Sequence, residues 1–252
     1  MSEEILYRLN KFISDTGFCS RREADKFIDN GQVTVNGKVA TVGLKVSAQD
    51  NVMVDGKPLK DKPKRVYIAY HKPVGITCTT ERHIHGNIID AIRYPERIFP
   101  IGRLDKPSEG LIFLTNDGDI VNKILRAGNA HDKEYVVTVN KPITERFIRQ
   151  MSSGVPILDT VTLPCTVTQK SKQSFSIILT QGLNRQIRRM CEHLGYEVQT
   201  LKRSRIMHIR LAGLKPGQWR LLDDIEIRML EAQLLTSSKT ADAAAANNSF
   251  DD

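Results

Sequence analysis

The sequence predicts an α+β protein with a small N-terminal domain and a larger second domain. Helical and strand patterns are intermixed without a regular strand–helix–strand repeat, which argues against a parallel α/β fold. Residues 57–65 contain two prolines and five cations and indicate an extended, solvated linker. We therefore expect domains at residues 1–56 and 66–235. Residues 236–252 have little to pack and are predicted to be a disordered tail.

Two short helices followed by a small sheet are predicted in the first domain. Apolar residues recur at helical spacing between residues 6 and 31. Ser20 and Glu23 form the sequence pattern of a capping box, which starts the second helix. Short alternating strands are followed by Asn36-Gly37 and by Asp55-Gly56, dipeptides typical of two-residue hairpin turns.

The larger domain is organised around residues 97–118, RIFPIGRLDKPSEGLIFLTNDG. Two apolar runs, predicted to be short buried strands, flank a charged segment bounded by glycines. In an extended backbone Arg103 and Asp105 would point to one side and Leu104 to the other. One carboxylate beside a cation on an anchored loop suits catalysis. A surface turn with solvated charges is the simpler alternative.

The rest of this domain carries further strand and helix patterns. Strands are predicted at residues 66–70, 133–139 and 174–179, and helices at 87–92, 119–126 and 144–152. The run 182–191 leads into a further helix, with Ile187, Met190 and Leu194 on one face. No GxGxxG or Walker-type loop occurs, so the sequence does not support nucleotide-cofactor chemistry.

The charge distribution points to a polyanionic partner. The net charge is +8 and the sequence pI is about 9.3. Residues 182–210 hold seven Lys and Arg against two Glu, whereas residues 1–60 hold nine cations against eight acids. A solvated helix face would explain the first cluster, but arginines beside a catalytic candidate favour phosphate binding. A binding face in the first domain would have to come from segregation of its charges.

Cysteine usage and hydropathy favour a reduced, cytoplasmic protein. The four cysteines form no CxxC pair, and the sequence has no signal-peptide core and no apolar stretch of membrane-spanning length. Cys78, His83 and His85 lie close in sequence but lack a spaced fourth ligand, so we expect no metal site.

The central stretch resembles the catalytic motif of the RsuA family of ribosomal RNA pseudouridine synthases. HKPVG, KEYVVTV and GLNRQIRRM occur in the order that this family shows, and the similarity covers most of residues 65–231. The N-terminal segment resembles an S4-type RNA-binding domain. ILRAGNAHDKEY and GLNRQIRRMCEHLGYEV are most similar to the RluF type within the family. The resemblance implies a catalytic domain with a mixed, mainly antiparallel sheet.

The resemblance also assigns roles to individual residues. Asp105 corresponds to the catalytic aspartate, Arg188 to the arginine that pairs with it, and Tyr135 to the tyrosine that stacks on the target base. Arg188 follows the apolar face of a helix, and a buried arginine needs an acidic partner. Leu183 and Ile187 are expected to close the other side of the base pocket. The expected RNA contacts are Arg103, Arg185, Arg189 and Lys72 in the larger domain, and Lys11, Arg21, Arg22 and Lys38 in the smaller one.

The implied activity is the isomerisation of a uridine in large-subunit ribosomal RNA, with a transfer RNA anticodon loop as a second candidate substrate. This reaction is redox-neutral and needs no cofactor or metal. The target must be flipped out or lie in a loop. Whether Asp105 attacks C1′ or removes a proton from C2′ stays open. We expect a monomer, and the acidic tail departs from the basic extensions of the RluF type.

Two other functions are compatible with parts of the sequence. A ribosome-assembly factor would bind RNA without catalysis, but it would not need Asp105, Tyr135 and Arg188 together. A glycosidase or nucleosidase usually uses two carboxylates, and Glu109 is the candidate for the second.

Overall fold

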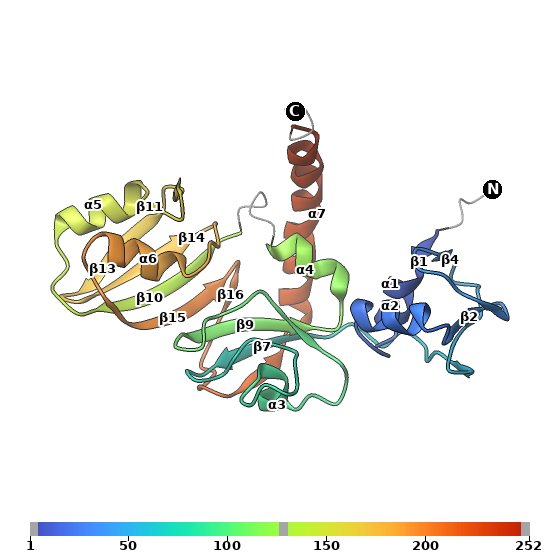
Figure 1. The fold of residues 1–252 in the computed structure, drawn as a ribbon. Helices are drawn as coiled ribbons and strands as arrows, with labels where there is room; N and C mark the ends of the chain where they lie inside the picture. Colours follow the sequence, from blue (N-terminus) through green and yellow to red (C-terminus); the bar gives the residue numbers. More distant parts are fainter. Residues whose placement is uncertain (1–4, 126–130, 248–252) are drawn as a thin grey trace. The chain divides into compact units, whose positions relative to one another are not determined.

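The computed structural model describes residues 5–125 and 131–247, and these form two compact units (Figure 1). The first unit comprises the chain up to Arg65 together with Tyr94–Arg97 and Asn116–Gly118. The second comprises Val66–Arg93, Ile98–Thr115 and the chain from Asp119 onward. Both units mix helices and strands, as the sequence predicts.

The first unit contains two helices and a small sheet. The sheet has four strands in the order β3-β2-β5-β6, and a separate pair joins β1 and β4. The elements are β1 (Tyr7–Arg8), α1 (Leu9–Asp15), α2 (Arg21–Asp29), β2 (Val33–Val35), β3 (Lys38–Val39), β4 (Lys45–Val46), β5 (Val52–Val54) and β6 (Lys57–Pro58). Leu9, Ile13, Ala24, Ile28 and Val33 form the centre of its apolar core.

The local signals of this unit are confirmed. The Ser20 hydroxyl accepts the amide of Glu23 at 3.2 Å, and the Glu23 carboxylate accepts the amide of Ser20 at 2.8 Å. Asn36-Gly37 connects β2 to β3 and Asp55-Gly56 connects β5 to β6. All four turn residues have positive φ, as two-residue hairpins of this type require.

The predicted linker is anchored at both ends, which differs from a solvated segment throughout. At its start, β6 pairs with β5 and Leu59 packs against the small core, so the sheet passes the predicted boundary at residue 56. At its end, the Asn116 amide donates to the carbonyl of Lys64 at 2.8 Å, and Arg65 lies 3.3 Å from the Asp117 carboxylate.

The second unit is built on a nine-stranded sheet. Its strands are β7 (Tyr67–Lys72), β8 (Phe99–Ile101), β9 (Glu109–Thr115), β10 (Lys133–Val139), β13 (Thr166–Ser171), β14 (Ser174–Leu179), β15 (Val198–Ile206), β16 (Ile209–Arg210) and β17 (Trp219–Leu221). The order is β13-β14-β10-β15-β9-β7-β17, with β16 beside β15 and β8 beside β9. Only β15 and β9 are parallel among the described pairs, which confirms a mixed, mainly antiparallel sheet.

Helices cover two parts of this sheet and create two apolar cores (Figure 1). The helices are α3 (Ile88–Ile92), α4 (Gly118–Leu125), α5 (Glu145–Ser153), α6 (Gln186–His193) and α7 (Asp224–Asn247), and a small hairpin joins β11 (Pro156–Ile157) and β12 (Thr160–Val161). The first core packs α5 and α6 on β10 and β14. The second packs α4 and α7 on β7 and β9. None of the helices in the described ranges is both long and apolar enough to cross a membrane.

Most predicted elements are confirmed to within a few residues, and the larger differences are β15 and α7. The charged run Lys202–Arg205 lies in the nine-residue strand β15, which was not predicted. Ile227, Leu230 and Leu234 have the spacing of a helix face that packs on the second core, a signal the sequence prediction did not use. α7 continues to Asn247, where a disordered tail was predicted from residue 236, because the alanine-rich segment has high helix propensity. Arg126 and residues 248–252, also included in predictions, lie outside the described residues.

Gly110 permits the one parallel strand contact of the described sheet. It pairs with Arg203 of β15, and its φ of 122° lies in the region that favours glycine. A Cβ atom at this position would overlap the backbone nitrogen and oxygen of Arg203. The close approach of β9 and β15 therefore requires a residue without a side chain.

Replacing Gly110 by alanine should destabilise the larger unit. We expect Gly110→Ala to lower the free energy of unfolding by about 2–4 kcal/mol, through backbone strain and overlap with β15. Urea unfolding followed by the fluorescence of Trp219, the single tryptophan, measures this. Gly182→Ala is the matched control, since no atom lies within 4 Å of its added Cβ. Equal stability of the two variants would contradict the strand contact.

Candidate active site

Asp105 lies on the loop that connects β8 to β9. Leu104 is buried, Arg103 is exposed, and the Asp105 side chain is 39% exposed, which confirms the predicted alternation. The amide of Ser108 donates to the carbonyl of Asp105 at 2.9 Å and closes a turn directly after the carboxylate. The carboxylate is therefore presented at the surface by a folded loop.

Contacts from the segment after β7 hold this loop from one side. The amide of Gly75 donates to the carbonyl of Lys106 at 2.8 Å, and the amide of Leu104 lies 3.4 Å from the Cys78 sulfur. The Lys72 ammonium supports this segment by donating to the carbonyls of Pro73 and Ile76 at 2.9 and 2.8 Å.

Lys72 is a supporting residue in this structure, and its side chain has no exposed surface for an RNA contact in this conformation. Its side chain is fully buried in the strand, and its ammonium is used by backbone carbonyls. Burial lowers the pKa of this ammonium, and the nearby Arg203 lowers it further, whereas Cys78 and Asp105 oppose the shift.

Arg188 of α6 holds the loop from the other side. Its guanidinium donates to the Pro107 carbonyl at 3.3 Å and to the Ser108 hydroxyl at 3.1 Å. A third bond reaches the carbonyl of Val198 at 3.4 Å. Burial and then Arg185 lower the pKa of Arg188, while Asp105 raises it. The buried arginine was correctly predicted, but its donors go to Pro107 and Ser108 of the loop and to Val198 of β15.

The predicted direct pair between Arg188 and Asp105 is replaced by a different one. In the described part of the chain, the ion pair of Asp105 is made by Arg185, with 4.0 Å between Nη1 and Oδ2. Asp105 turns toward solvent, where Arg185 is 42% exposed, whereas Arg188 is buried beneath the loop. Arg185 precedes α6 with a φ of 49°, an uncommon conformation for a residue with a side chain.

Tyr135 lies in a row of residues that crosses four strands. Strand register places Lys72 opposite Gly110, Gly110 opposite Arg203, and Arg203 opposite Tyr135. The Arg203 guanidinium carbon lies 5.9 Å from the centroid of the Tyr135 ring, and its Nε donates to the Leu111 carbonyl at 2.6 Å. Arg203 is only 5% exposed. Sequence reasoning counted it only as part of the basic cluster at residues 182–210. In β15 it shares a face with the buried Leu201, two residues earlier.

The predicted base-pocket residues Leu183 and Ile187 lie at the first apolar core, against which Tyr135 also packs. Ile187 is buried in the first apolar core, and Tyr135 and Leu183 are half-buried against it. Asp105 approaches this region because Arg188, one residue after Ile187, bonds its loop. Tyr135, Leu183 and Ile187 thus meet at one apolar core, and Arg188 links α6 to the Asp105 loop.

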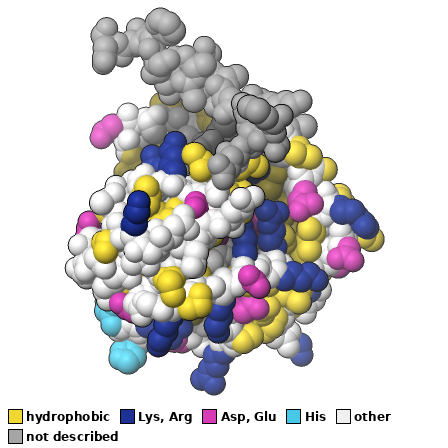
Figure 2. Space-filling view, turned by 90° about the vertical axis from the view of Figure 1, so that its right-hand side faces the viewer, with side chains coloured by type: hydrophobic (Ala, Val, Ile, Leu, Met, Phe, Trp, Pro, Cys, Tyr) yellow, Lys and Arg dark blue, Asp and Glu magenta, His cyan; other side chains and the backbone are white. Residues whose placement is uncertain are grey.

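The other predicted RNA contacts differ in their exposure. Arg21, Arg22, Lys38 and Arg103 are exposed, and Arg189 bonds Asn184 at 3.1 and 3.2 Å while remaining half-exposed. Lys11 is only 19% exposed and lies 2.6 Å from the Asp15 carboxylate, so much of its charge is neutralised. Figure 2 shows Lys and Arg side chains interspersed with Asp and Glu on one face of the molecule.

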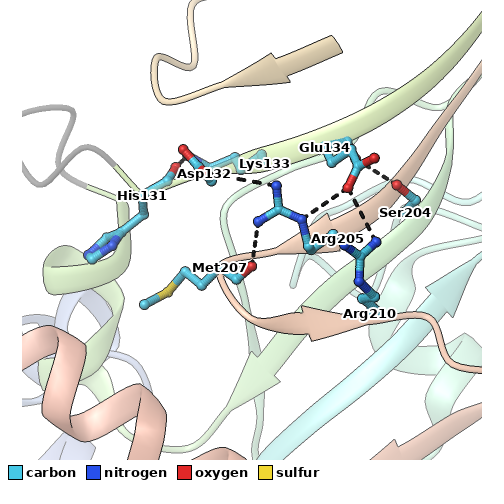
Figure 3. A network of polar contacts seen from close by, with 8 residues as sticks. All are labelled: His131, Asp132, Lys133, Glu134, Ser204, Arg205, Met207 and Arg210. Carbon is cyan, nitrogen blue, oxygen red and sulfur yellow. Dashed lines mark hydrogen bonds and ion pairs between the residues drawn. The ribbon is translucent and has the colours of Figure 1, made fainter. Parts of the chain in front are cut away.

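Two further members of the basic cluster form a structural network around Glu134 (Figure 3). The Glu134 carboxylate accepts from Arg205 at 3.0 Å and from Arg210 at 3.3 Å, and the bond from Arg205 lowers the pKa of this carboxyl. Arg205 also donates to the Met207 carbonyl at 2.6 Å. These contacts fasten the start of β10 to β15 and β16, directly before Tyr135. Two of the cations counted in the basic cluster, Arg205 and Arg210, are therefore engaged by Glu134 in this structure.

Glu109, the second carboxylate of the glycosidase alternative, lies 3.7 Å from the ammonium of Lys202. Within the described residues, no group of three or more His, Cys, Asp or Glu side chains is arranged to hold a metal ion.

Arg188 should control the order of the Asp105 loop. We expect Arg188→Met to accelerate amide hydrogen exchange of Ser108 and Gly75 by tenfold or more, because each lost charge-assisted hydrogen bond stabilises by about 1.5–3 kcal/mol. Ser108→Ala should have a smaller effect, since it removes one of the bonds. Arg149→Met on α5, where the arginine is 74% exposed, is the control. Unchanged exchange in Arg188→Met would show that the loop is held without α6.

Comparisons with known proteins place this site in a family. The RNA pseudouridylate synthase family model matches residues 66–193, and the S4 domain model matches residues 8–52. The chain is 59% identical to "Dual-specificity RNA pseudouridine synthase RluF" of Escherichia coli K12 over 222 residues, which cover 87% of this chain and 77% of that relative. It is 36% identical to "Ribosomal large subunit pseudouridine synthase B" of Bacillus subtilis 168, covering 89% of this chain and 96% of the relative.

A solved structure shares the fold. A crystal structure of a pseudouridylate synthase superposes with a TM-score of 0.66 at 27% identity, covering 88% of this chain and 99% of that one. The expected family is thereby confirmed. The protein belongs to the RNA pseudouridylate synthase family, as an RNA pseudouridine synthase of the RsuA type with an N-terminal S4 domain.

Proposed function

We propose that the protein isomerises a specific uridine of large-subunit ribosomal RNA and that Asp105 is the catalytic carboxylate. The observation that carries this proposal is the position of Asp105 on a loop held by β7, α6 and their flanking segments, with its carboxylate accessible beside Arg185. The name of the Bacillus subtilis relative supports the substrate class. The relative named as dual-specificity supports a second RNA substrate, for which we propose a transfer RNA anticodon loop.

The proposed reaction uses residues of this chain alone. The C1′–N1 bond of the target uridine breaks, the uracil turns, and C5 joins C1′, so atoms and oxidation state are unchanged. Asp105 either bonds to C1′ until C5 joins that carbon, or removes a proton from C2′. Tyr135 would stack on the uracil, and Leu183 and Ile187 would close the opposite side and keep the detached base in place.

Arg188 is proposed as a positioning residue for Asp105. It bonds the two residues that follow Lys106 in the loop and so fixes the direction of the carboxylate. Small displacements matter here, because a misplacement of about 1 Å can cost on the order of 10²-fold in rate. We also propose that the protein acts as a monomer in the cytoplasm, which agrees with a candidate site made by one chain.

RNA binding is proposed to involve both units. Arg103, Arg185 and Arg189 lie around the Asp105 loop and the start of α6, where phosphates next to the flipped uridine would approach. Arg21 and Arg22, exposed at the start of α2, and Lys38 are the candidates in the S4 domain. Arginine forks are well suited to phosphate oxygens.

Pseudouridine mapping tests the reaction and its carboxylate. Ribosomal and transfer RNA from a host that lacks the enzyme would be incubated with wild type or with Asp105→Asn. We expect new pseudouridine with wild type alone, because the amide can neither attack C1′ nor accept a proton. Conversion by both proteins would exclude Asp105 as the catalytic group. Tight RNA binding without conversion by either would favour the assembly-factor alternative, and released uracil would favour a nucleosidase.

The S4 contacts are tested by salt dependence. We expect the double variant Arg21→Gln/Arg22→Gln to weaken RNA binding and to reduce the slope of log K against log salt by about 0.7–0.9 per lost phosphate contact. The rate at saturating enzyme should be retained, because these residues are in the first unit. Lys26→Gln, an exposed cation on the same helix, is the control. An unchanged salt slope in the double variant would remove Arg21 and Arg22 from the interface.

A further inference from the structure

Arg203 is a buried cation without a carboxylate partner among the described residues. It is 5% exposed, its Nε bonds the Leu111 carbonyl at 2.6 Å, and its Nη2 is buried with no hydrogen-bond partner in the described chain. Removing one charge from water without pairing it is costly. A positive group held in this way therefore calls for a source of negative charge that the protein alone does not supply.

The surroundings of Arg203 are also positive. Lys72 lies in the same row of the sheet, with only Gly110 between them, and Lys133 precedes Tyr135 by two residues on the same strand. Arg203 lowers the pKa of both lysines, after burial as the larger cause, so the three cations lie within electrostatic range. The Lys133 ammonium donates to the carbonyls of His131 and Thr180 at 3.3 and 3.4 Å. Of the nearby acids, Asp105 and Glu109 act on Lys72, and Asp132 acts on Lys133.

These cations lie beside the group proposed to hold the base. Tyr135 and Arg203 are direct partners on neighbouring strands, so their side chains emerge on the same face of the sheet. The guanidinium lies 5.9 Å from the Tyr135 ring centroid. A uracil stacked on this ring would thus be held close to a buried positive charge that water does not screen.

The proposed reaction produces a negative charge at this place. When the C1′–N1 bond breaks, its electron pair leaves with the uracil, which becomes an anion with charge on N1 and the two carbonyl oxygens. The sugar is left electron-deficient at C1′, and Asp105 relieves this either by bonding to C1′ or by taking the C2′ proton. The anion is consumed when C5 joins C1′, after which C5 loses its proton and N1 takes one up. Asp105 is released, or returns its proton to C2′.

We propose that Arg203 stabilises the detached uracil anion from behind the Tyr135 ring, as an electrostatic positioning residue that does not itself contact the base. This inference rests on the proposed function. The charge is held in advance by the Leu111 carbonyl and by the backbone contact with Gly110, so no reorganisation is needed when the bond breaks. Lys133 and Lys72 add to the positive potential of the same region.

The test compares leaving groups in single-turnover reactions. The RNA hairpin identified by pseudouridine mapping would be prepared with uridine or with 5-fluorouridine at the target, and loss of the N1 linkage would be measured by mass spectrometry. Fluorine stabilises the uracil anion and reduces its need for a nearby cation. We expect Arg203→Met to slow uridine cleavage on the order of tenfold, because the charge acts through space from behind the Tyr135 ring and not by direct contact with the base. The loss should be smaller with 5-fluorouridine, and Arg203→Lys should recover part of the rate.

The controls separate electrostatics from structure. Lys170→Met removes an exposed cation from β13 of the same domain and should react as wild type. RNA affinity and thermal unfolding of each variant report on the fold. Equal losses with both bases and no recovery by Arg203→Lys would overturn the inference and assign Arg203 a packing role. Wild-type rates in Arg203→Met would overturn the inference alone, whereas no conversion by wild type would overturn it together with the proposed function.

Discussion

The parallel contact between β9 and β15 is the constraint on which the larger unit depends. It joins the part of the sheet that carries α5 and α6 to the part that carries α4 and α7. Gly110 allows this contact because a Cβ there would overlap the Arg203 backbone. The contact also brings the Asp105 loop, which leads into β9, close to Tyr135 on the neighbour of β15. The same strand contact therefore joins the two parts of the sheet and assembles the site.

Buried polar groups hold the site together. Lys72 and Arg188 direct their donors to backbone carbonyls on two sides of the Asp105 loop, so the loop has a defined conformation without regular secondary structure. These bonds offset the free energy that burial of a charge costs. Part of the guanidinium is left unpaired in the described chain at both arginines, Nε of Arg188 and Nη2 of Arg203. A rigid, partly unsatisfied positive region is the arrangement expected where a reaction creates negative charge.

The basic cluster at residues 182–210 illustrates how one charge pattern divides into several roles. Arg185 faces the Asp105 carboxylate, Arg188 anchors the loop, and Arg203 lies behind Tyr135. Arg205 and Arg210 neutralise Glu134 and fix the strand before Tyr135 (Figure 3). The net charge of such a segment is consequently a poor measure of how many of its cations are free to meet RNA.

The amino-acid sequence by itself determined the local elements and the family. The capping box at Ser20, the turns at Asn36-Gly37 and Asp55-Gly56, and the strands around the Asp105 loop follow from interactions over a few residues, which a linear pattern records. The ordered motifs likewise identified Asp105, Tyr135 and Arg188 as candidates. Tertiary structure alone decided which cation faces Asp105, that Lys72 is buried, and that Arg203 lies against Gly110 and Tyr135. Those outcomes depend on strand register and on burial between segments about a hundred residues apart. The sequence does not record whether a charged side chain is surrounded by water or buried on a sheet.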